Sequence, residues 1–85
     1  MASKKKKTVN VKMAGKQAIK YLCDIEDAVY DVQLEEVEKS DDGNFWLITL
    51  SYNTGILSNK KYKIFKIDIS SGEVLSMKIR KFNEE

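Results

Sequence analysis

The spacing of apolar residues near the start of the chain predicts an amphipathic helix. Small and apolar side chains recur every three or four residues, which is the period of one helix face. They are Val11, Ala14, Gly15, Ala18, Leu22 and Ile25. Asn10 precedes them and is a favourable N-cap, because its side chain can accept a hydrogen bond from a free amide of the first turn. Gly15 costs the helix about 1 kcal/mol relative to alanine, so we expect another element to pack closely there.

After residue 28 the period of the apolar positions changes to two, which predicts a β-strand. The alternation slips by one residue between Leu34 and Val37, and a β-bulge at Glu35-Glu36 would explain the slip. Three more alternating runs follow, at 45–53, 61–69 and 74–82. We therefore predict an α+β fold, with one N-terminal amphipathic helix packed on a four-stranded antiparallel meander.

The residues between the runs are typical of tight hairpin turns. Asp41-Asp42-Gly43-Asn44 joins the first two strands, and Ser70-Ser71-Gly72-Glu73 joins the last two, with Gly72 placed to adopt a positive φ. The period also predicts the contact between helix and sheet. We expect Val11, Ala14, Ala18 and Leu22 to pack on Ile48, Leu50, Ile67 and Met77, with Trp46 buried in phase with them.

The alternation leaves the sheet apolar on both faces, although one helix can cover only one of them. Phe45, Leu47, Tyr62 and Ile64 fall on the second face, together with Phe82. An apolar pair, Ile56-Leu57, also lies at an otherwise polar hairpin tip. Exposed apolar groups of this kind mark contact surfaces. We predict that these residues contact a protein partner, or a second copy of the chain through an open sheet face or a sheet edge.

Composition and charge define the remaining organisation. The 85 residues suffice for one domain, which we place at 9–85, after a disordered basic tail at 1–8. Residues 1–16 hold six lysines and no acid, whereas residues 17–45 hold nine acids. No apolar run follows the lysines or approaches the length of a transmembrane helix. The single Cys23 excludes an internal disulfide and is expected to be a small buried hydrophobe. We therefore expect a cytoplasmic protein that does not cross a membrane.

The sequence carries no pattern typical of an active site. Histidine is absent, which removes His-based triads and the usual zinc sets. The acidic residues lack calcium-loop spacing, so we interpret them as solvated surface and expect no metal, no cofactor and no enzymatic activity. Lysines interleave with aromatic residues at 60–66, as in surfaces that bind single-stranded nucleic acid. The candidate anion contacts are Lys4, Lys5, Lys6, Lys7, Lys61 and Lys63.

The C-terminal half resembles PepSY-like domains. The resemblance covers about residues 14–80 and is carried by three stretches of the chain. These are Phe45-Trp46-Leu47-Ile48-Thr49-Leu50, Tyr62-Lys63-Ile64-Phe65-Lys66-Ile67-Asp68 and Ser71-Gly72-Glu73-Val74-Leu75. The resemblance implies a helix followed by antiparallel strands and a role in inhibiting or regulating peptidases. Domains of that family are usually exported or membrane-tethered, whereas no signal segment is evident here.

Two functional hypotheses follow from the sequence. The first is a non-enzymatic protein-binding or regulatory module that resembles PepSY domains. The second is a protein that binds nucleic acid or another anionic surface through the N-terminal lysines and the lysines of the 61–69 strand.

Overall fold

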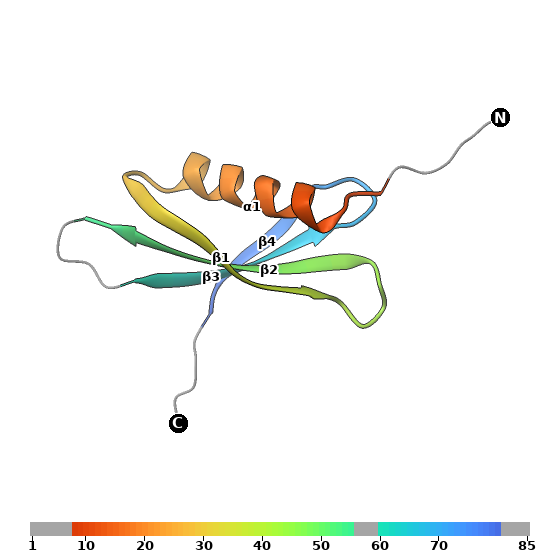
Figure 1. The fold of residues 1–85 in the computed structure, drawn as a ribbon. Coiled ribbons are helices and arrows are strands. Elements are labelled where there is room, and N and C mark those ends of the chain that lie inside the picture. The colour runs from red at the N-terminus through yellow and green to blue at the C-terminus, as the bar shows by residue number, and fades with distance from the viewer. Residues whose placement is uncertain (1–7, 56–59, 81–85) are drawn as a thin grey trace, which may run out of the picture.

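A computed structural model describes residues 8–55 and 60–80 of the chain. It contains one helix and four strands: α1 (Val11–Ile25), β1 (Val29–Lys39), β2 (Phe45–Thr54), β3 (Lys61–Asp68) and β4 (Val74–Ile79). The strands form one antiparallel sheet in the order β1-β2-β3-β4, and α1 lies across one face of it (Figure 1). The predicted α+β meander is confirmed. No helix in the described residues is long and apolar enough to span a bilayer.

Helix α1 begins and ends with satisfied backbone groups. The Asn10 side chain accepts a hydrogen bond of 2.9 Å from the Met13 amide, as predicted for an N-cap. The buried face is narrower than the predicted stripe and consists of Ala14, Gly15, Ala18 and Leu22. Val11 and Ile25, the first and last residues of α1, are 39% and 55% exposed. The prediction was wrong for Val11, because the ends of the helix lie outside the contact with the sheet.

The core lies between α1 and the covered face of the sheet. Side chains that alternate along β2 and β3 meet the buried residues of α1; they are Ile48, Leu50, Tyr52, Phe65 and Ile67, all fully buried. Trp46 was expected to be buried in this row but is only half-buried. Its indole Nε1 donates to the Val9 carbonyl at 2.8 Å, and the Val9 amide donates to the Ile69 carbonyl at 2.7 Å. The partly exposed position of Trp46 therefore allows its indole N–H to make a hydrogen bond.

Strand β1 is bulged twice against β2. The register shifts between Leu34 and Glu36, where the sequence predicted a bulge. A second shift, between Tyr30 and Gln33, was not predicted; it includes Asp31, whose φ is 58°. The Asn53 side chain donates to the Asp31 carboxylate at 3.2 Å. The left-handed conformation is uncommon for a residue with a side chain but is tolerated best by Asp and Asn.

Predictions were also made for two glycines and for the single cysteine; those for the glycines are confirmed. A Cβ atom at Gly15 would lie 3.1 Å from Cδ1 of Leu34, so the close packing expected at this glycine is confirmed. Gly72 has a φ of 80° in the β3–β4 turn, as predicted. Cys23 is exposed, and the expectation that it is buried was wrong. It follows Leu22 directly, and one residue rotates the side chain by about 100° away from the buried face.

The open face of the sheet as candidate functional site

The face of the sheet opposite α1, here called the open face, is not covered by any helix of the described residues (Figure 1). Its residues follow from the strand register, because directly opposed residues in neighbouring strands point to the same side. Leu47 lies between Glu38 of β1 and Lys66 of β3. Thr49 lies between Glu36 of β1 and Ile64 of β3. The open face is therefore a mixture of apolar, hydroxyl and charged positions.

One half of the open face is closed by its own polar side chains. Arg80 Nη1 donates to Thr49 Oγ1 at 2.8 Å and forms an ion pair of 2.7 Å with Glu36. Ser51 Oγ donates to Glu35 Oε2 at 2.6 Å. Thr49 is 1% exposed and Ser51 is fully buried, although neither faces the helix. The second face is therefore apolar at the predicted positions Phe45, Leu47 and Ile64 but polar at Thr49 and Ser51.

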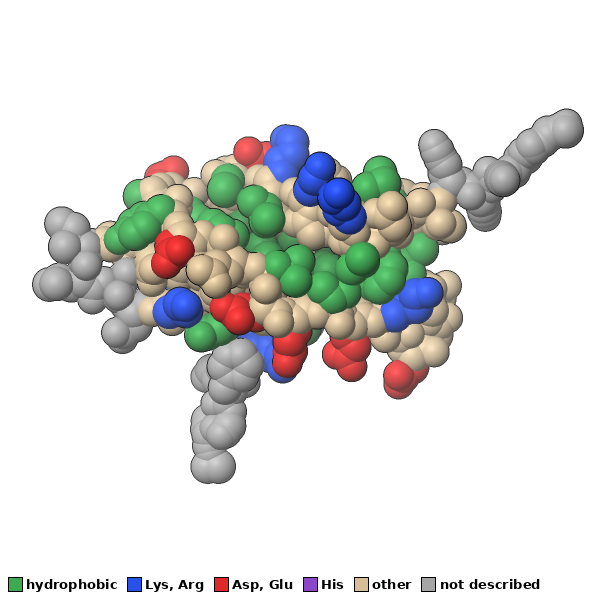
Figure 2. Space-filling view, viewed as in Figure 1, with side chains coloured by type: hydrophobic (Ala, Val, Ile, Leu, Met, Phe, Trp, Pro, Cys, Tyr) green, Lys and Arg blue, Asp and Glu red, His purple; other side chains and the backbone are tan. Residues whose placement is uncertain are grey.

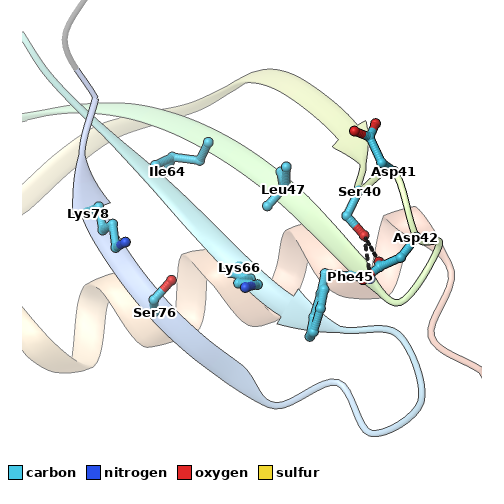
Figure 3. Close-up of a pocket in the computed structure, with 9 residues that line it drawn as sticks. All are labelled: Ser40, Asp41, Asp42, Phe45, Leu47, Ile64, Lys66, Ser76 and Lys78. Atoms are coloured by element: carbon cyan, nitrogen blue, oxygen red, sulfur yellow. Dashed lines mark hydrogen bonds between the residues drawn. The ribbon is translucent and has the colours of Figure 1, made fainter.

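The other half of the open face forms an apolar hollow of about 410 Å³. Its lining residues come from β2, β3 and β4 and from the turn after β1, and Figure 3 shows them on the side of the sheet away from α1. They are Ser40, Asp41, Asp42, Phe45, Leu47, Ile64, Lys66, Ser76 and Lys78. Phe45, Leu47 and Ile64 were predicted contact residues; all three are half-buried, and the structure brings them together here.

The β1–β2 turn positions the acidic side of the apolar hollow. Asp42 Oδ1 accepts hydrogen bonds from the Ser40 hydroxyl at 2.7 Å and from the Asn44 amide at 3.0 Å. The amide of Asn44, and then the Ser40 hydroxyl, lower the pKa of Asp42, so its carboxylate stays charged. Asp41 lines the hollow beside it. Acidic side chains also gather along the lower rim of the molecule, over the sheet, in Figure 2.

Lysines of β3 and β4 also line the apolar hollow. Lys66 and Lys78 both line it, and Ile64 pairs with Lys78 across the two strands. The Lys66 ammonium lies over the Phe45 ring, 4.4 Å from its centroid, which is a cation–π distance. Lys78 and Asp41 were not predicted as contact residues, and Lys66 was predicted only among the strand lysines of the nucleic-acid hypothesis. The strand register could have identified the two lysines, because it pairs Lys66 with Leu47 and Lys78 with Ile64.

A second hollow, of about 490 Å³ and here called the lysine hollow, lies at the end of the sheet where β3 begins. It is lined by Glu26, Tyr52, Lys60, Lys61, Tyr62, Lys63, Ile79 and Arg80. The structure thus brings together two predicted anion contacts, Lys61 and Lys63, and separates Tyr62 from the apolar hollow. Lys63 Nζ lies 3.3 Å from Glu26 Oε2 and is paired with it. The other predicted contacts lie outside the described residues; they are Lys4, Lys5, Lys6, Lys7, Ile56, Leu57 and Phe82.

Tyr52 is the unusual polar group of the lysine hollow. Its side chain is fully buried, and its hydroxyl makes no well-aligned hydrogen bond within the described part of the chain. Burial, then the negative charge of Glu26 and the contact of the hydroxyl with that carboxylate, raise the pKa of Tyr52. The hydroxyl therefore stays protonated at neutral pH.

Neither hollow contains the side chains of a recognisable metal centre. Among residues 8–55 and 60–80, no group of three or more Cys, Asp and Glu side chains is arranged to hold a metal ion. The polar groups of the apolar hollow are carboxylates, ammonium groups and hydroxyls that act as hydrogen-bonding and charged contacts. This arrangement suits recognition of another surface.

Comparison with known proteins finds no matching family model, no matching curated protein and no matching solved structure. The resemblance to PepSY-like domains therefore stays a prediction.

Proposed function

We propose that this chain is a non-enzymatic protein-binding module whose docking surface is the apolar hollow of the open face. One observation carries the proposal: Phe45, Leu47 and Ile64 share a hollow on a sheet face that no helix of the described segments covers. Burying apolar surface contributes about 25 cal/mol per Å², so contact with a partner would stabilise a complex at these residues. Small proteins keep such exposed hollows mainly where another molecule binds.

The charges around the hollow define the chemistry of the partner. Asp41 and Asp42 lie at one end of the hollow and Lys78 lies at the other, with Lys66 between them beside Phe45 (Figure 3). A complementary surface has an apolar centre, with cations at the end that meets the aspartates and anions at the end that meets Lys78. Arrangements of this kind supply orientation and specificity more than affinity. The partner is therefore a folded surface or a strand-like segment with separated charges.

The resemblance to PepSY-like domains supports a regulatory role for this binding. Domains of that family are associated with peptidase inhibition or regulation, and the proposed docking surface lies within the stretch that carries the resemblance. A module that binds without catalysis acts by occupying or positioning its partner.

An alternative function is binding of nucleic acid or another anionic surface. The observation that favours it is the lysine hollow, where Lys60, Lys61, Lys63 and Arg80 line one cavity. Two of these cations are already compensated, because Lys63 pairs with Glu26 and Arg80 pairs with Glu36. Lys60 and Lys61 therefore carry most of the available positive charge, which makes this the weaker proposal.

A peptide-display selection tests the docking surface without a known partner. A random peptide library is selected on the wild-type chain and counter-selected on Leu47→Glu, which puts a charge in the apolar hollow. We expect enriched peptides with an apolar centre, and amide NMR shifts on binding at Phe45, Leu47 and Ile64. Peptides that bind wild type and Leu47→Glu equally, or shifts confined to the lysine hollow, would contradict the proposal.

A further inference from the structure

The end of the apolar hollow beside the β1–β2 turn, here called the acidic end, carries a negative net charge. Asp41 and Asp42 line it from the turn, next to Phe45 of β2 (Figure 3). Asp68 of β3 is the cross-strand partner of Phe45, so it points to the same face. Lys66 lies over the Phe45 ring, and its ammonium group offsets part of this charge. The acidic end therefore favours a cation on the partner.

The opposite end of the hollow, here called the basic end, carries Lys78 of β4 (Figure 3). Lys78 pairs with Ile64 of β3, which pairs with Thr49 of β2. It is exposed and takes part in none of the ion pairs of the described residues. Arg80, the next cation along the chain, is compensated by Glu36. Lys78 therefore offers a positive charge to an anionic group of the partner.

The strand register gives the distance between the two ends. Phe45 and Thr49 are four residues apart on β2, which corresponds to about 14 Å along the strands. Lys78 lies in the same row as Thr49 but two strands away, about 10 Å across the sheet. The backbone at Phe45 and the backbone at Lys78 are therefore about 17 Å apart. Leu47 and Ile64 lie between them (Figure 3), so a ligand that meets both ends carries opposite charges about this far apart, with an apolar group between.

We propose that the occupant of the apolar hollow is an extended segment of a partner protein that carries a basic, an apolar and an acidic side chain on one side. The inference rests on the proposed function, because it names the partner for the same docking surface. Every second side chain of an extended chain points the same way, about 7 Å apart, which is also the interval between the rows of Phe45, Leu47 and Thr49. Charged residues separated by four or six positions span about 14–20 Å and therefore reach both ends. A helix would need about eleven residues to cover that length, so the spacing of the charges in a bound peptide distinguishes the two forms.

Three synthetic peptides with blocked ends test this pattern by NMR titration. The probe peptide carries lysine, tryptophan and glutamate at its first, third and fifth positions, separated by serines. The uncharged control has glutamine in place of the lysine and the glutamate. The shifted control has the same composition as the probe, but its glutamate is at the sixth position, where an extended chain turns it away from the hollow. We expect the probe to bind about tenfold more tightly than the uncharged control and about threefold more tightly than the shifted control, with amide shifts at Leu47, Ile64 and Lys78.

Double-mutant cycles between the protein and the probe identify which end binds which charge. Lys78→Gln is combined with peptides in which either the glutamate or the lysine is replaced by glutamine, and Asp41→Asn is combined with the same peptides. We expect coupling of about two- to fivefold in affinity for Lys78 with the glutamate and for Asp41 with the lysine, and none for the crossed pairs. Asp42 is left unchanged because it holds the β1–β2 turn. Lys61→Gln, in the lysine hollow, is the matched control and should leave the affinity unchanged.

Circular dichroism verifies that every variant is folded. Equal or tighter binding of either control peptide, no binding of the probe at millimolar concentration, or coupling in the crossed pairs overturns the extended charged segment. If displayed peptides still require Leu47 in any of these cases, the proposed function stands. A probe peptide that binds Leu47→Glu as tightly as wild type overturns both.

Discussion

At the scale of single residues, Tyr52 is where the fold accepts an unfavourable polar group. The phenol ring fills the core between α1 and the sheet, while its hydroxyl is buried without a well-aligned hydrogen bond to any described residue. The nearby Glu26 carboxylate accepts a hydrogen bond from Lys63 Nζ. An unsatisfied buried polar atom costs about 1–3 kcal/mol, so the ring contributes to stability and the oxygen opposes it.

Replacing Tyr52 by phenylalanine is therefore expected to keep or raise the free energy of unfolding at pH 7. The substitution also changes the response to base. Because the pKa of Tyr52 is raised in the folded state, the unfolded chain ionises first. Stability is then fully present below the unfolded value of about 10 and falls as pH rises through the folded pKa. Urea denaturation of both proteins between pH 8 and 11 measures this loss, which Tyr52→Phe should lack. A less stable variant at pH 7 would show that the hydroxyl has a stabilising partner.

At the scale of elements, the contact between α1 and β1 depends on a glycine. A Cβ atom at Gly15 would lie 3.1 Å from Leu34 Cδ1, closer than an ordinary van der Waals contact. Leu34 is 46% exposed, so its methyl group can move at a cost. Gly15 therefore lowers the intrinsic stability of the helix but allows β1 to pack closely against it.

A double-mutant cycle separates propensity from packing at this contact. In a Leu34→Ala background, Gly15→Ala meets no methyl group and should stabilise the protein by about 1 kcal/mol, the full difference in helix propensity. In the wild-type background the same change displaces Leu34, so the gain should be smaller or negative. Chemical denaturation of the four proteins gives the coupling energy. Equal effects of Gly15→Ala in the two backgrounds would show that the contact imposes no cost.

The features of the helix and strands that were predicted correctly depend on residues close together in the sequence. The helix cap at Asn10, the bulge before Glu36 and the turn at Gly72 each depend on a few neighbouring residues. The bulge at Asp31 and the closure of half the open face by Arg80 were missed because they depend on distant strands; Arg80 and Glu36 are 44 residues apart. Alternation within single strands identified Phe45, Leu47 and Ile64 as residues of the second face. The charged side chains around them lie on neighbouring strands or in the turn, so they could not be identified without knowing how the strands pair.

At the scale of the whole molecule, charge is separated along the chain and again on its surfaces. Residues 1–16 carry six lysines and no acid, while residues 17–45 carry nine of the thirteen acidic residues. Such separation attracts anionic partners to one part of the molecule and repels them from another. Salt dependence therefore distinguishes a functional basic segment from one that only aids solubility.

Titration of duplex DNA at several salt concentrations tests the nucleic-acid alternative. Four phosphate contacts by Lys4, Lys5, Lys6 and Lys7 imply a log–log salt slope of about −3.6, at about −0.9 per contact. Binding would then weaken by roughly 150-fold between about 50 and 200 mM salt. We expect no measurable binding even at the lower salt concentration, because Glu26 and Glu36 compensate Lys63 and Arg80 and leave few cations in the lysine hollow. A slope near −3.6 that disappears when the four lysines are changed to serine would establish the alternative. A slope that persists in that variant would assign binding to Lys60 and Lys61.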